Sequence, residues 1–222
     1  MAVQQSPHDA DYPATPRTTP ARKADRVGYD RTGVHAVLDA DYICHVGFVA
    51  DGAPVVLPML YARVAERLYL HGSTGARALH SARDGLRVCV TVTLADGIVL
   101  ARSAVHHSVN YRSVVAHGVA HRVGDAAECR TALDALIDAP FPGRSADCRP
   151  ADSKELAKTA VLRLDLREVS AKVRSGGVNE EPGDRDLPHW AGVVPARRAY
   201  GPPVPDTGSP GPLPHYLRGL PA

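Results

Sequence analysis

The sequence predicts a mainly β protein with short helices, built as an antiparallel barrel. About six or seven runs rich in β-branched and aromatic residues follow one another from residue 42 to residue 173. Asp51-Gly52 separates two of these runs, and Asp-Gly is the strongest short hairpin signal. Only short helical patterns interrupt the runs. We therefore expect hairpin-ordered strands rather than the parallel sheet of an α/β protein.

The first half of the chain predicts a helix, a hairpin, a third strand and a second helix, over residues 31–40, 42–64, 67–72 and 73–85. In the first helix Val34, Val37 and Leu38 lie at helical spacing.

The second half predicts more strands, with Asp96-Gly97 as the turn of another hairpin. We expect three further strands, an amphipathic helix, a helical turn and a final strand, over residues 86–94, 98–107, 111–123, 127–139, 155–159 and 160–173.

The two ends of the chain differ from the middle. Residues 1–24 and 196–222 are rich in Pro and lack apolar periodicity. Such segments bury too little apolar surface to offset their ordering entropy, so we expect two tails around one domain over residues 25–195. The second tail is a candidate to extend along its own domain or a neighbouring one.

Composition narrows the function classes. The 26 Lys and Arg nearly balance the 24 Asp and Glu in 222 residues, which gives no electrostatic reason to expect nucleic acid or a membrane surface as partner. The four cysteines form no C-x-x-C pair, so structural zinc is not expected. The first residues carry no apolar core and no apolar run approaches the ~20 residues of a membrane span, so we expect neither a signal peptide nor a membrane helix. We expect a cytoplasmic protein with free thiols.

The segment from His71 to Arg77 is the first candidate site. A predicted strand delivers His71, Gly72 and Ser73 to a helix start, where free amides bind anions and Arg77 can add a charge-assisted bond. An ordinary capped helix with a solvated Arg77 fits the same residues, and local chemistry alone favours that simpler interpretation.

A second candidate is the polar segment 102–113, between two strongly apolar strands. Some of its polar groups must lie near the core and need partners, although an exposed turn is an equal alternative. Trp190, the one tryptophan, is either a packing anchor for the chain end or a cover for a flat ring at the edge of a site.

The spacing of the eleven histidines gives little support for a metal site, and the sequence lacks the common motifs of nucleophilic catalysis. His117 and His121 are four apart in a predicted strand, about 13 Å along it, too far to share one ion. The sequence contains no H-E-x-x-H, G-x-S-x-G, G-x-x-x-x-G-K-[ST] or G-x-G-x-x-G motif. No metal site is expected.

Taken in order, several segments resemble the pyridoxamine 5'-phosphate oxidase-like family, which folds as an FMN-binding split barrel. They are RVGYDRTGVHAVLDA, CHVGFVADGAPVVLPMLYAR, LYLHGSTGARAL, VCVTVTLADGIVLARSAVHHSVNYRSVVAHG, SAKVRSGG and HWAG. The branch with nitroimidazole-resistance and flavin-nucleotide-binding proteins is the more similar one. The resemblance implies a split β-barrel and a homodimer with FMN at each subunit interface.

The resemblance also implies which residues contact the flavin. In such proteins one strand lies along the flavin ring, the next strand end and helix start hold the ring edge and phosphate, and the partner subunit adds a Trp and a basic residue. The implied cofactor-binding residues are Val56, Leu57, Pro58, Met59, Leu70, His71, Gly72, Ser73, Arg77, Ser113, Arg144 and Trp190. Of these, His71 is also the candidate catalytic residue. The sequence after Trp190, AGVVPARRAYG, lacks the oxidase's Arg-His pair and argues against true pyridoxamine phosphate oxidation.

Three functions remain open at this point. The first is an FMN-dependent oxidoreductase that passes electrons from a nicotinamide or deazaflavin to a small flat acceptor, such as a nitroaromatic or quinone. The second is a flavin-storage module with little turnover. The third is a haem-binding split barrel in which His71 or His117 ligates iron.

Overall fold

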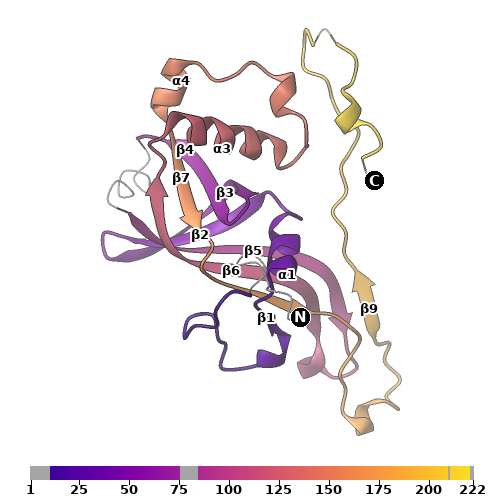
Figure 1. Ribbon diagram of the computed structural model, residues 1–222. Helices are drawn as coiled ribbons and strands as arrows, with labels where there is room; N and C mark the ends of the chain where they lie inside the picture. The colour runs from indigo at the N-terminus through magenta and orange to yellow at the C-terminus, as the bar shows by residue number, and fades with distance from the viewer. Residues whose placement is uncertain (1–10, 76–84, 210, 221–222) are drawn as a thin grey trace, which may run out of the picture.

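The computed structural model describes residues 11–75, 85–209 and 211–220 (Figure 1). Its strands are β1 (Val27–Gly28), β2 (Ile43–Ala50), β3 (Ala53–Val64), β4 (Arg67–Ser73), β5 (Leu86–Leu100), β6 (Ser108–Arg122), β7 (Thr159–Asp165), β8 (Glu168–Arg174) and β9 (Gly192–Pro195). The α-helices are α1 (Arg31–Leu38), α3 (Ala126–Asp138) and α4 (Ser153–Lys158).

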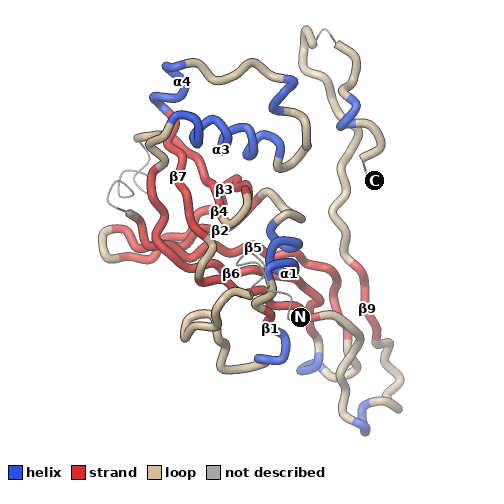
Figure 2. The backbone as a smooth tube through the Cα atoms, viewed as in Figure 1, coloured by secondary structure: helices blue, strands red, loops and turns tan. Residues whose placement is uncertain are grey.

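The strands pair antiparallel in the order β1-β8-β6-β7-β4-β3-β2-β5-β9, and an additional β6–β5 pairing closes six of them into a barrel. β8 and β1 extend the sheet beyond β6, and β9 extends it beyond β5. Figure 2 shows how the strands dominate and how the helices lie at their periphery. The predicted antiparallel, mainly β barrel is confirmed.

The interior of the barrel follows from the alternation of side chains along its strands. In β2, Cys44, Val46 and Phe48 are buried, whereas the residues between them face outward. Helix α1 closes one end with the buried Val34 and Leu38, and the Tyr61 hydroxyl donates to the Leu38 carbonyl at the end of this helix.

Helix α3 covers the outer face of β3, β4 and β7. A second apolar cluster forms there around Tyr69, Ala132 and Val161. Asp125 caps the helix by accepting a hydrogen bond of 2.7 Å from the Glu128 N–H. Because Tyr69 belongs to this outer cluster and Leu68 and Leu70 to the inner one, the predicted alternation of β4 is confirmed.

Among the described residues, two predicted elements differ from the structure, and the helix predicted over residues 73–85 lies largely outside them. The hairpin turn at Asp96-Gly97 is wrong, because β5 continues through it with a register shift between Ala95 and Gly97. A Cβ on Gly97 would lie 2.9 Å from the Val194 carbonyl oxygen of β9, so the glycine serves the close approach of a neighbouring strand.

The single strand predicted over residues 160–173 is two strands, β7 and β8. Between them the Leu166 N–H donates to the Glu66 carbonyl, at 2.8 Å. β7 then pairs with β4 and with the end of β6, and β8 pairs with the rest of β6, so the apolar run passes from one side of β6 to the other. A continuous apolar pattern does not reveal such a crossing.

The described part of the N-terminal segment packs against the barrel, unlike the disordered tail expected over residues 1–24. Tyr12 is 3% exposed and belongs to the main core cluster. Its N–H donates to the Tyr29 carbonyl at 2.9 Å, and its hydroxyl donates to Glu66 at 2.6 Å and lies 2.9 Å from His35 Nε2. One buried aromatic residue is enough to hold this Pro-rich segment against the barrel. The composition of the whole segment does not reveal a single residue of this kind. Residues 1–10 lie outside the described residues.

Glu168 holds this N-terminal arm through a second contact. Its carboxylate accepts hydrogen bonds from Arg17 and from the Thr15 hydroxyl, and these contacts lower its pKa from 4.5 to about 2. A carboxyl group whose pKa is lower in the folded state than in the unfolded state stabilises the fold. This stabilisation is complete at pH values above the unfolded-state pKa and is lost as the pH falls toward the folded-state pKa.

We therefore expect the melting temperature to fall as pH is lowered from about 5 toward about 2, and to fall less steeply in Glu168→Gln. Thermal unfolding followed by circular dichroism across this range tests the expectation. An equal slope in both proteins would contradict it.

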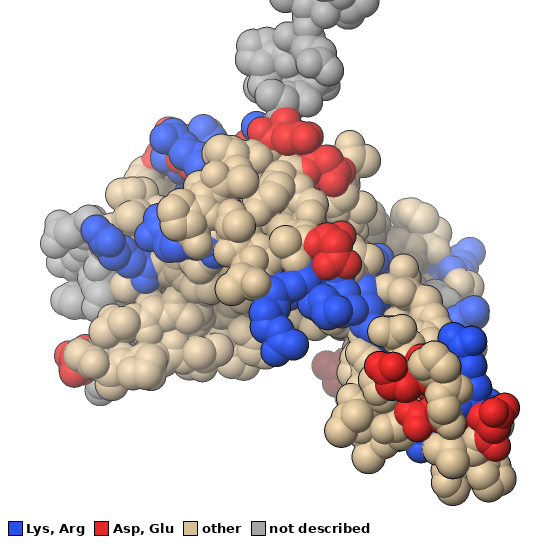
Figure 3. Space-filling model, turned by 90° about the horizontal axis from the view of Figure 1, so that it is seen from below, with Lys and Arg blue, Asp and Glu red and all other residues tan. Residues whose placement is uncertain are grey.

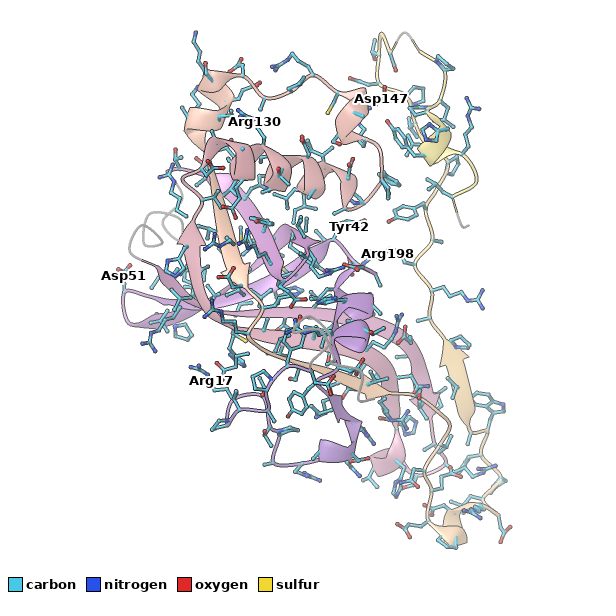
Figure 4. The ribbon with its side chains drawn as sticks, viewed as in Figure 1. Arg17, Tyr42, Asp51, Arg130, Asp147 and Arg198 are labelled. Atoms are coloured by element: carbon cyan, nitrogen blue, oxygen red, sulfur yellow. The ribbon has the colours of Figure 1, made fainter. Side chains whose placement is uncertain are left out.

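The C-terminal segment from residue 196 runs as an extended arm beside the barrel (Figure 1). Figure 4 shows Arg198 beside Tyr42, and Arg198 forms a bidentate pair with Asp41 at 2.8 and 2.7 Å. Further along the arm, the Tyr216 hydroxyl donates to Asp147 at 2.8 Å. Two anchors therefore hold the arm, with exposed residues between them.

Candidate functional site

The ladder between β3 and β4 ends at the pair Tyr61 and Leu70. Continued register would place His71 opposite Leu60, but β4 continues only against β7 and β3 only against β2. The two strands therefore separate here. The predicted residues 56–59 and 70–73 lie on the two strands that part, so the structure places them around one opening.

The β3 side of the opening is apolar and open along its edge. Val56 is 64% exposed and Leu57 is 39% exposed. Val56 and Pro58 point outward, whereas Met59 packs against the core. From Ala53 to Leu60 the edge that faces away from β2 has no ladder partner among the described residues, so backbone polar groups remain available there.

The β4 side presents His71. Its ladder partner is Val161, so it lies on the outer face, which Tyr69 and Val161 share. His71 Nδ1 is buried and has no hydrogen-bond partner among the described residues. Burial lowers the pKa of the imidazole, which favours its neutral form near pH 7. A buried, unpartnered nitrogen is rare enough to suggest a ligand.

The other residues predicted to contact the flavin from β4 and the turn after it differ in how they can reach the opening. The Leu70 side chain is fully buried in the core, so only its backbone can reach the opening. The Ser73 hydroxyl accepts from the Gly75 N–H at 3.3 Å and shapes the turn after β4. Arg77 lies outside the described residues, and its phosphate contact stays a prediction.

Ser113 lies on the outer face of β6 and donates to the Lys172 carbonyl at 3.3 Å. Pro58 is paired with His45, His45 with Thr91, and Thr91 with Val115, so this face is continuous from β3 to β6. Ser113 is next on that face, roughly 14 Å from β3 by strand spacing. The structure thus places Ser113 on the face where the opening lies.

Trp190 does not reach this face within one chain. It is 65% exposed, and its ring lies over Gly192, which pairs with Leu100. Leu100 lies about 35 Å of extended strand beyond Cys89, the β5 residue in line with the opening. A role for Trp190 at the site therefore requires a second copy of the chain. Arg144 bonds to the Tyr216 hydroxyl of the C-terminal arm at 3.0 Å.

Sequence reasoning missed the start of β5 as part of the site. A groove of about 540 Å³ lies beside Val56 and is also lined by Gly47, Arg87 and Cys89. A Cβ on Gly47 would make only ordinary van der Waals contact with the Cys89 carbonyl oxygen, at 3.5 Å. The strand pairing of β2 with β5, which no local pattern predicts, forms the groove.

Among the described residues, no group of three or more His, Cys, Asp or Glu side chains could hold a metal ion. No helix in the described ranges is long and apolar enough to cross a membrane.

A family model described as pyridoxamine 5'-phosphate oxidase matches residues 30–173, well over half of the chain. The chain belongs to the pyridoxamine 5'-phosphate oxidase family. No curated protein matches the sequence.

Three solved structures are similar to this chain. The flavocytochrome Anf3 from Azotobacter vinelandii is 36% identical over 91% of this chain and 95% of its own, with a TM-score of 0.85. A FAD- and haem-binding protein from Mycobacterium smegmatis is 37% identical over 88% and 97%, with a TM-score of 0.82. A 5-nitroimidazole antibiotic resistance protein from Bacteroides thetaiotaomicron is 22% identical over 66% and 86%, with a TM-score of 0.56, and shares the fold alone.

Proposed function

We propose that this pyridoxamine 5'-phosphate oxidase family member is a homodimeric flavoprotein that carries electrons to a small flat acceptor. The observation that carries the proposal is the opening between β3 and β4, with its apolar edge and the unpartnered His71 Nδ1. The sequence resemblance implies FMN, whereas the second similar structure is described as binding FAD. FMN and FAD share the flavin ring. We propose FAD because the similarity to the FAD-binding structure covers 88% of this chain.

The residues at the opening fit a flavin. Val56 offers exposed apolar surface to a flat ring on the outer face, and the unpaired edge of β3 offers backbone donors and acceptors to a polar ring edge. When bound, the flavin supplies hydride or electron transfer, and the chain supplies position and electrostatics. His71 holds a proton donor toward negative charge that develops on reduction. Ser73 and Arg77 are the proposed phosphate contacts.

A second candidate function, haem binding, is favoured by His71 itself. A neutral imidazole is the form that ligates a metal, and burial keeps His71 neutral. Both similar structures above 30% identity are described as a flavocytochrome or a haem-binding protein. We propose His71 as the ligand of this haem. His117, the other candidate, pairs with Cys89 and Glu168 in the sheet and has no comparable unpartnered atom among the described residues.

The reductant in this proposal is a nicotinamide or a deazaflavin, and the partner subunit supplies Trp190 and Arg144 to the site. A storage module with little turnover is the competing account. Stopped-flow mixing of the purified protein with each reductant, and then with a nitroaromatic or a quinone, separates the two. Reduction without subsequent reoxidation by either acceptor would favour storage.

A matched pair of variants tests the position of the flavin. Val56 and Val204 are both exposed valines, at 64% and 91%, but only Val56 is among the residues implied to contact the flavin, and Val204 lies in the C-terminal arm. We expect Val56→Arg to weaken flavin affinity at least about tenfold, because the long charged side chain displaces an apolar contact. Val204→Arg is expected to change it little. Fluorescence quenching titrations measure both, and equal losses would contradict the proposed position.

A further inference from the structure

Four basic side chains form a patch at the edge of the sheet beside β1. They are Arg22, Lys23, Arg26 and Lys172. Arg22 and Lys23 are exposed, and the other two are half-buried. The structure gives none of the four an ion pair or side-chain hydrogen bond within the described residues. This differs from the many arginines elsewhere that are paired with carboxylates.

Figure 3 shows basic side chains gathered over η1 (Ala24–Arg26) and β1, in the centre of that view. In the same view a group of acidic side chains lies on the projecting lobe between β8 and β9, and other acidic side chains lie elsewhere on the visible face. Asp25 is the acidic residue within the η1 segment. The chain as a whole carries a net charge of only +2, so the patch is a local concentration of charge. Such a patch attracts an acidic surface and speeds its association.

The patch adjoins the face proposed to hold the cofactor. Lys172 is paired with Ser113 on one side and with Val27 on the other. Directly opposed partners in a sheet present their side chains on the same face. A molecule bound at the patch would therefore lie next to Ser113. Ser113 lies one strand spacing from Lys172, roughly 5 Å, and β3 lies roughly 14 Å further along the same face.

We infer that the basic patch docks a small acidic electron-carrier protein that reduces the bound cofactor. This inference rests on the proposed function and adds a protein as a second source of electrons beside the nicotinamide or deazaflavin. A protein fits better than a small molecule, because small-molecule sites are concave and these cations lie on the open surface (Figure 3). In the transfer the carrier loses one electron and the cofactor gains it, and no bond forms or breaks.

The test uses the purified full-length protein with a [2Fe–2S] ferredoxin as the acidic probe. Isothermal titration calorimetry is expected to show binding that weakens at least about tenfold from about 0.02 M to about 0.2 M salt. The variant Arg22→Glu/Lys23→Glu/Arg26→Glu is expected to weaken binding, and the rate of reduction by ferredoxin, by at least about tenfold. Its reduction by dithionite and its cofactor content should stay unchanged.

The matched control carries the same change in net charge on other faces. It replaces three basic residues by Glu at Arg130, Lys154 and Arg197. Equal losses in both triple variants, or no ferredoxin binding by the wild-type protein, would overturn the inference. Stronger binding of the wild-type protein to anionic lipid vesicles or to DNA would also overturn it, since the patch would then serve those surfaces. Calorimetry measures ferredoxin binding whether or not a cofactor is bound. A protein found to contain no flavin would therefore refute the proposed function, and the binding measurement would still test the inference.

Discussion

Replacing Tyr12 by alanine is expected to lower the free energy of unfolding by about 3–5 kcal/mol, the range for removing a buried aromatic side chain. Tyr12 is 3% exposed in the main core, although it belongs to a segment with no core-forming pattern. Its loss would also leave Glu66 and His35 without their hydroxyl partner. Urea unfolding followed by circular dichroism measures the change.

Two controls separate the ring from the hydroxyl and from the rest of the segment. Tyr12→Phe keeps the ring and is expected to cost about 1–2 kcal/mol, the penalty of unsatisfied partners. Deleting residues 1–10 is expected to cost nothing measurable. If Tyr12→Ala proved as stable as the wild type, the described packing of the N-terminal arm would be incorrect.

The second large effect concerns His71. We expect His71→Leu to slow reduction of the bound flavin by about 10²-fold or more, the cost of removing one donor to developing charge, and to remove haem if His71 is its ligand. Stopped-flow absorbance measures the reduction rate, and the pyridine haemochrome assay measures the haem.

His71→Gln distinguishes the two roles. Glutamine keeps a donor of similar reach, so a hydrogen-bonding role predicts partial recovery of the reduction rate. It does not replace imidazole as an iron ligand, so a ligand role predicts that haem is lost in both variants. Full rates and unchanged haem in His71→Leu would reduce His71 to a part of the pocket wall.

The barrel was predictable because its signals are local. The Asp51-Gly52 turn and the alternation in β2 and β4 each determine a hairpin or a buried face without reference to the rest of the chain. The Asp96-Gly97 turn was not predictable in the same way. There the same dipeptide lies inside β5, because β9 arrives from a distant part of the sequence and pairs across it.

Part of the candidate site could be predicted from the sequence, and part depends on which strands pair. The resemblance to a family supplied 56–59 and 70–73, and strand register then placed both segments at one opening. Patterns in the sequence did not reveal the unpartnered Nδ1 of His71 or the groove formed by β2 and β5. Both depend on which strands become neighbours. The packing of Tyr12 could not be predicted for another reason: a single buried residue produces no periodic pattern in the sequence.

The central claim, a flavin-binding redox protein with haem as a second group, is tested most directly by the visible absorption spectrum of freshly purified protein. Mass spectrometry of the released cofactor accompanies it. We predict the two-band spectrum of an oxidised flavin, release of FAD rather than FMN, and an additional Soret band from haem. A colourless protein that takes up neither flavin nor haem on titration would contradict the account.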